Sequence, residues 1–161
     1  MQQDRILAAI ALPQYQKAVE RTRVTQVIPI LKALAMAEEE YRLIYGDYTN
    51  NFNELTIGFG EYTYVSGSMP SLRGKDFTIS MTYEGGFGAY PRAVECNSDV
   101  TTTALASQSC YLVGIVRGSG NLFCVNGIKT PVSKIKRCEN IGFTKPVKVK
   151  LEGWEGNGFT N

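Results

Sequence analysis

The sequence of 161 residues contains no histidine. Histidine is the commonest general base and the commonest metal ligand, so its absence excludes Ser-His-Asp and Cys-His catalytic sites whatever the fold. A phosphate-cradling glycine loop is also missing, because Gly85-Gly86-Phe87-Gly88 lacks both the lysine and the strand-to-helix context. The sequence gives no positive sign of an enzyme, and we expect no catalytic residue, no cofactor and no bound metal.

Carboxylates cluster at one place, Glu38-Glu39-Glu40, and no carboxylate-rich calcium loop appears. On a helix, consecutive side chains point about 100° apart, so these three cannot converge on one substrate. We expect a solvated helical face here, with contact to the basic surface of a neighbouring subunit as the alternative.

A hydrophobic run long enough to cross a membrane is missing too. The apolar run Ile6–Leu12 has seven residues, about a third of the ~20 that a bilayer requires. It leads into a helical pattern that continues to Tyr45, with apolar residues at Val24, Val27, Leu31, Leu34 and Tyr41, and with Ile30, Ala37 and Ile44 beside them. Because Pro13 and Pro29 each remove a backbone hydrogen bond, we expect a bent continuous helix; a true break at Pro29 is the alternative.

After Gly60 the pattern changes to the alternation of strands. Strands are predicted at 61–65, 76–83, 89–96 and 145–152, and a hairpin is predicted from 110–117 and 121–125 around Gly118-Ser119-Gly120. Pro146 suggests an edge strand, with Val147, Val149 and Leu151 pointing inward. Trp154 is expected to cap the sheet, and Gly156-Asn157-Gly158 reads as a flexible tail. Together with the long helix, these strands predict an α+β fold.

The formal net charge is only +2, but one 22-residue window holds seven cations against the single acid Glu139. The interpretation we favour is a solvated surface with lysines at strand edges; the alternative is a patch for DNA or an acidic surface. The candidate surface-binding residues are Lys129, Lys134, Lys136, Arg137, Lys145, Lys148 and Lys150.

The four cysteines, Cys96, Cys110, Cys124 and Cys138, are separated by 13 residues each. Zinc sites favour closer pairs, so two disulfides in an oxidising compartment fit better. Three pairings are conceivable. The hairpin disfavours a Cys110–Cys124 bond, because a turn near Ser119 would place Cys110 well past Cys124 on the opposite strand.

The stretch ILAAIALPQYQKAVERTR, starting at Ile6, resembles the end of the membrane-spanning half of type IV pilins and pseudopilins. The resemblance is dense from Ile6 to about Asn53 and mainly architectural afterwards. It implies a long N-terminal helix packed on an antiparallel sheet, with a disulfide-stapled C-terminal loop. Cys138-Glu139-Asn140-Ile141-Gly142 is similar to the family's closing cysteine, which favours Cys124–Cys138 and, with it, Cys96–Cys110.

The family's basic leader and apolar stretch with an early glutamate have no counterpart before Ile6. We therefore expect Met1–Arg5 to replace the missing half, residues 1–53 to be the helix and the start of the following loop, and residues 54–161 to be the head. A chain truncated in this way is expected to be a monomer or a weak oligomer. The resemblance implies filament packing through Ile6, Leu7, Ile10, Leu12, Pro13 and Tyr15.

The function that the resemblance implies is that of a structural pilus subunit. Its partners would be further copies of itself, the assembly machinery, the inner membrane and, as open options, DNA or a host surface. It would lie in an extracellular filament, after a precursor stage in the inner membrane facing the periplasm. The alternatives are a secretion-system pseudopilin, which the basic, cysteine-containing C-terminal region disfavours, and a minor pilin that binds DNA or another ligand.

Overall fold

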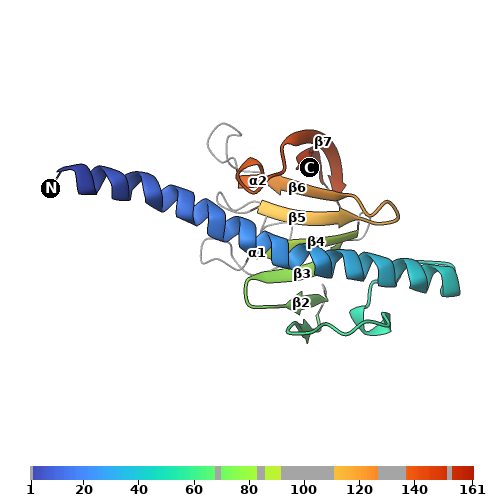
Figure 1. Ribbon diagram of the computed structural model, residues 1–161. Helices are drawn as coiled ribbons and strands as arrows, with labels where there is room; N and C mark the ends of the chain where they lie inside the picture. The colour runs from blue at the N-terminus through green and yellow to red at the C-terminus, as the bar shows by residue number, and fades with distance from the viewer. Residues whose placement is uncertain (1, 68–69, 83–85, 92–110, 127–136, 152–153) are drawn as a thin grey trace.

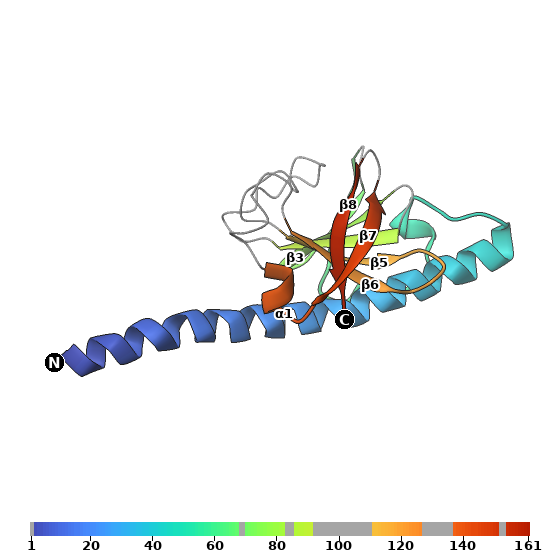
Figure 2. The same cartoon turned by 90° about the horizontal axis from the view of Figure 1, so that it is seen from above.

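A single α-helix, α1, runs from Gln2 to Tyr45 and carries the rest of the chain on its second half (Figure 1). The computed structural model describes residues 2–67, 70–82, 86–91, 111–126, 137–151 and 154–161; for 2–13, 82, 90–91, 137, 150–151 and 154–156 it describes the backbone. The helix continues through both prolines, so the predicted continuous helix is confirmed and the break at Pro29 is wrong. Figures 1 and 2 show a gently curved rod.

Eight strands in the described residues form one antiparallel sheet, in the order β1-β2-β3-β4-β5-β6-β8-β7. The strands are β1 (Thr63–Val65), β2 (Ser71–Arg73), β3 (Phe77–Thr82), β4 (Gly86–Pro91), β5 (Tyr111–Val116), β6 (Leu122–Asn126), β7 (Lys145–Leu151) and β8 (Trp154–Thr160). A 3₁₀ turn, η1 (Phe52–Glu54), follows α1 and precedes β1, and a short helix, α2 (Arg137–Asn140), lies between β6 and β7 in the chain. The predicted α+β fold, a long helix on an antiparallel sheet, is confirmed.

The core lies between one face of α1 and the middle of the sheet. Buried residues of the helix recur every three or four positions, which keeps them on one face. They pack with side chains from alternate positions of β3, β4 and β5, as the pleat of a strand requires. The helix contributes Val24, Val27, Leu31, Leu34 and Ala37, and the strands contribute Phe77, Ile79, Met81, Phe87, Ala89, Tyr111, Val113 and Ile115. Ile44, expected beside this face, is instead 64% exposed.

The last two strands, β7 and β8, fold over the face of the sheet that points away from α1. Figure 2 shows β7 and β8 running at a steep angle to the strands that lie on α1. On the face away from the helix, Val149 of β7 packs with Leu112, Phe123 and Val125 in a second, smaller core. The sheet is therefore covered by α1 on one face and, at β5 and β6, by its own last hairpin on the other.

The last hairpin corrects two predictions. Residues 156–158 are not a tail, because β8 pairs with β7 along its whole length, from Leu151↔Trp154 to Lys145↔Thr160. Gly158 is required there: a Cβ atom at this position would lie 2.5 Å from Val149 Cγ2. Pro146 does lie on an edge strand, as predicted, but of the described apolar side chains predicted to point inward only Val149 is buried, and Val147 is 36% exposed. The short strand β2 was not predicted.

Glu38 overturns the expected solvated acidic face, because its side chain is only 1% exposed. It occupies the gap in the apolar stripe between Leu34 and Tyr41 and faces the sheet. The guanidinium of Arg117, just after β5, donates to both carboxylate oxygens, with 2.9 Å from Nε to Oε2 and a second, shorter bond from Nη2 to Oε1. This bidentate geometry is the strongest way to pair a carboxylate with a side chain.

The Arg117 guanidinium also lies 4.6 Å from the centre of the Tyr48 ring, in the loop after α1. One cation therefore links the helix, the β5–β6 turn and the loop. Burial raises the pKa of Glu38, and the hydrogen bond and charge of Arg117 oppose that rise. Arg117 therefore favours the charged form of this carboxyl against the cost of its burial.

Removing Arg117 alone should therefore destabilise the head strongly. We expect Arg117→Met to lower the free energy of unfolding by about 3–5 kcal/mol, because it leaves a buried carboxylate without its partner. Urea unfolding followed by circular dichroism measures this loss. The control is Arg42→Met, which breaks a more exposed pair with Glu39 and should cost clearly less. The double variant Glu38→Leu/Arg117→Met should recover most of the loss; a double variant no more stable than Arg117→Met would contradict this account.

Candidate functional site: the free helical segment and the disulfide-closed loop

The first part of α1 lies outside the head. Both ribbon views show its N-terminal end extending well beyond the sheet. The first described helix residue in the core is Val24, and Tyr15 is 68% exposed. The backbone of residues 6–13 belongs to this free part and is helical, and every residue from Ile6 to Leu12 is apolar. The residues predicted to pack in a filament, from Ile6 to Tyr15, thus lie on the part of α1 that projects beyond the head. Their role in packing stays a prediction.

The C-terminal region is closed by a disulfide between Cys124 and Cys138, whose Cα atoms are 5.6 Å apart. This is the pairing that the family resemblance favours. The hairpin argument also holds, since Cys124 pairs with Val113 across β5 and β6. Cys96 and Cys110 lie outside the described residues, so their pairing stays a prediction.

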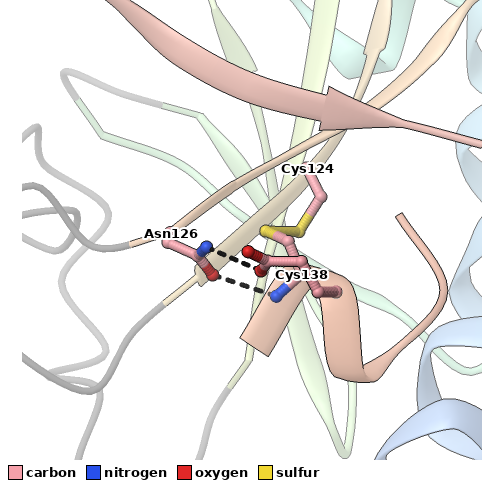
Figure 3. The surroundings of a disulfide bond; sticks show 4 residues. Cys124, Asn126 and Cys138 are labelled. Carbon is pink, nitrogen blue, oxygen red and sulfur yellow. Dashed lines mark hydrogen bonds between the residues drawn. A yellow bond between two sulfur atoms is a disulfide. The ribbon is translucent and has the colours of Figure 1, made fainter. Parts of the chain in front are cut away.

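Asn126 joins the two sides of the disulfide-closed loop (Figure 3). Its side-chain oxygen accepts from the backbone N–H of Cys138 at 2.9 Å, and its nitrogen donates to Glu139 Oε2 at 3.1 Å. These two hydrogen bonds hold the start of α2 against the end of β6. From α2 the contact continues to the long helix, because Arg21 Nε donates to the carbonyl oxygen of Asn140 at 2.6 Å.

The basic window is only partly visible. Lys129, Lys134 and Lys136 lie outside the described residues, and for Arg137 and Lys150 only the backbone is described. Lys145 and Lys148 are both exposed on edge strand β7. Strand alternation places Lys145 and Lys148 on opposite faces of β7. Binding by these residues remains a prediction.

A second polar network, which the sequence analysis missed, fixes the loop after the helix. The Tyr48 hydroxyl donates to Glu39 Oε1 at 2.5 Å, and Arg42 Nε donates to Glu39 Oε2 at 3.0 Å. The hydrogen bond from Tyr48, followed by that from Arg42, lowers the pKa of Glu39. The same hydrogen bond raises the pKa of Tyr48. Because the partners come from a loop outside the helical pattern, periodicity alone could not reveal them.

A long helix whose second half packs on an antiparallel sheet, with a disulfide closing the C-terminal loop, is the fold of type IV pilins. The chain is similar to two fimbrial proteins of Pseudomonas aeruginosa. One is 42% identical over 84 residues, which cover 47% of this chain and 54% of the relative. The other is 42% identical over 67 residues, which cover 39% of this chain and 44% of the relative.

These relatives confirm the resemblance to type IV pilins that the sequence shows. The chain spans about half the length of the curated relatives it matches. No protein-family model matches it, and the comparison with solved structures found no match.

The disulfide should contribute a measurable part of the stability. Cys124 and Cys138 are 14 residues apart, and closing a loop of this length is worth about 3 kcal/mol in the chain-entropy model. We expect Cys124→Ala/Cys138→Ala to lose about that much in urea unfolding. Asn126→Ala, which keeps the disulfide but removes its two hydrogen bonds, should lose less. Equal stability of the double variant and the parent chain would show that the bond does not constrain this region.

The lowered pKa of Glu39 predicts a defined pH dependence. A carboxyl whose pKa is lower in the folded chain stabilises it above the unfolded pKa of about 4.3, and this contribution disappears as the pH falls through the folded value. Glu39→Gln should therefore be less stable than the parent chain at pH 7, with the difference shrinking below about pH 4. Thermal unfolding between pH 3 and 7 measures this, with exposed Glu40→Gln as the matched control. A difference that stays constant down to pH 3 would be inconsistent with the lowered pKa.

Proposed function

We propose that this chain is the head and part of the helix of a filament-forming, non-enzymatic pilin, the structural subunit of a type IV pilus. The observation that carries the proposal is the division of α1. Its second half is covered by the sheet, whereas its apolar first part extends away from the head (Figure 1). The printed name of both relatives, fimbrial protein, points to the same role.

In the proposed filament, the helices pack along the centre and the heads form the outside. Each copy would contact its neighbours through different surfaces, a heterologous contact that does not close and therefore grows into a fibre. Burial of apolar helix surface at about 25 cal/mol per Å² would drive the contact. Ile6, Leu7, Ile10, Leu12, Pro13 and Tyr15 would pack in the fibre.

The proposed setting is an extracellular filament supplied by a precursor in the inner membrane and built by a pilus assembly machinery. Adhesion, motility or DNA uptake would then act through the filament. Among the described residues, no helix combines the length and the apolar character needed to cross a bilayer. In this proposal the precursor's membrane contact is made by the apolar N-terminal segment that is typical of the family.

Of the two alternatives, a pseudopilin is the less favoured, because the Cys124–Cys138 bond lies in the region where major pseudopilins usually carry a calcium loop instead of a disulfide. A minor pilin that binds DNA needs one contiguous basic face. Within the described part of the chain, the alternation of Lys145 and Lys148 on β7 does not favour such a face.

The test is assembly. Residues 2–161 are placed behind the N-terminal segment of the P. aeruginosa fimbrial protein, in a strain that lacks that protein, and sheared filaments are examined by electron microscopy and gel electrophoresis. We expect filaments that contain the chimera, and we expect Ile6→Asp/Ile10→Asp to abolish them. A chimera that folds, as judged by its intact disulfides on a non-reducing gel, yet never enters filaments would overturn the proposal.

A further inference from the structure

The stretch of α1 between the apolar run and the head is exposed around the whole helix. Residues 14–18 are all exposed, and the first described core residue of the helix, Val24, comes six residues later. Figures 1 and 2 both show this part of α1 outside the head. We call residues 14–23 the neck. Since no described part of the head covers residues 14–18, their side chains are open to a partner.

The side chains of α1 change in character in a fixed order from the apolar run into the neck. Ile6–Leu12 is apolar throughout, Tyr15 is 68% exposed, and Lys17 is exposed as well. A bilayer has the same order, because its hydrocarbon is followed by an interface where Tyr is enriched and then by headgroups that attract Lys and Arg when they are anionic. The neck therefore has the residue types that suit a helix where it leaves a membrane surface.

The spacing along the helix fits this order. At a rise of about 1.5 Å per residue, Tyr15 lies about 4.5 Å beyond Leu12, and Lys17 lies about 7.5 Å beyond it. The headgroup layer on one side of a bilayer is about 5–8 Å thick. With Leu12 at the edge of the hydrocarbon, Tyr15 falls within this layer and Lys17 at its outer boundary. Because helical side chains lean towards the N-terminus of the helix, the Lys17 ammonium can reach back to the phosphates.

The outward side of the neck is positively charged. Among the described residues, no ion pair involves Lys17. Arg21 is four residues farther on and therefore lies on the same side of the helix. Its Nε donates to the carbonyl oxygen of Asn140, a neutral group that does not cancel the charge of the guanidinium.

The other charged groups of the neck are turned away or paired. Glu20 is half-buried and lies on the side of Val24, four residues on, which faces the head. Arg23 forms an ion pair with Asp76 at 3.6 Å. The two cations that remain for a partner, Lys17 and Arg21, are thus not opposed by an acid on their own side of the neck.

We propose that the neck binds the surface of an anionic phospholipid bilayer through Tyr15, Lys17 and Arg21. The Tyr15 ring lies among the headgroups and Lys17 pairs with phosphate, while Arg21, about 6 Å farther along the helix, adds to the attraction within a Debye length of about 10 Å. This inference rests on the proposed function, because it concerns the precursor before assembly. In the filament the same tyrosine would pack against other copies.

The experiment measures how the whole chain partitions onto vesicles. The chain is mixed at low ionic strength with vesicles of phosphatidylglycerol or of phosphatidylcholine and is sedimented with them. We expect partition onto phosphatidylglycerol, little onto phosphatidylcholine, and release by added salt, which screens exposed charges. Lys17→Gln should weaken the partition about fivefold, the effect of one basic residue near an anionic surface.

Two matched controls separate the neck from the charge and exposed rings of the chain as a whole. Lys148→Gln makes the same charge change at an exposed lysine on β7 and should leave the partition unchanged. Tyr15 and Tyr45 are both 68% exposed, and of Tyr15→Ser and Tyr45→Ser only the first should weaken the partition. All four side chains are exposed, so none of these variants should unfold the head. Equal partition onto the two lipids, no partition onto phosphatidylglycerol, or equal effects within either pair of variants would each overturn the proposal.

The outcome is separable from that of the proposed function. Filaments from the chimera, together with a chain that does not prefer anionic vesicles, would reject the lipid contact and keep the pilin proposal. A preference that depends on Lys17 and Tyr15, without filaments, would keep the lipid contact and reject the filament.

Discussion

The structure depends on one packed surface, the face of α1 from Val24 to Ala37 that lies on β4 and β5. Where this face is apolar, its burial drives the attachment of the head to the helix. Where it is interrupted, Glu38 enters the core and must be matched by Arg117. Because the buried face starts at Val24, the helix before it contributes no described side chain to the apolar core. The same packing thus produces both a head and a projecting rod.

Polar contacts then fix the parts of the head that the core does not reach. At the far end of α1, Glu39, Arg42 and Tyr48 hold the loop that leads to the sheet, and Arg117 contacts the same tyrosine ring. At the near end, the Cys124–Cys138 bond holds α2, and Arg21 connects α2 to the helix. Each end of the head is therefore tied back to α1 by its own set of contacts.

Sequence patterns predicted the long helix, the β5–β6 hairpin and the edge position of Pro146, because each depends on local periodicity or on one residue's backbone chemistry. They failed where the deciding partner is distant in sequence. The sequence predicted that Glu38 belongs to a solvated acidic face. Its burial depends on the ion pair with Arg117, which is 79 residues away in the sequence. The step of seven between Leu34 and Tyr41 was the available signal, since a buried position was due within it.

The glycines of β8 misled for a related reason. Gly156-Asn157-Gly158 has the composition of a tail, but Gly158 is small because the backbone of β6 and the side chain of Val149 approach it closely. Composition cannot distinguish a glycine that makes the backbone flexible from one that is needed because neighbouring atoms leave no space for a side chain. Similarly, Val147 and Ile44 fit the apolar periods of their elements, yet both lie beyond the area that the opposing layer covers.

The central claim is that α1 is one helix with a covered half and an uncovered half. Native-state hydrogen exchange on the purified chain, resolved by peptide or by NMR, measures this directly. Amides of residues 24–41 should exchange only through unfolding of the head, whereas amides of residues 6–12 should exchange much faster, because a helical segment without tertiary contacts is marginally stable in water. Equal protection of the two segments would contradict the account, since it would mean that the apolar run is also packed against the head.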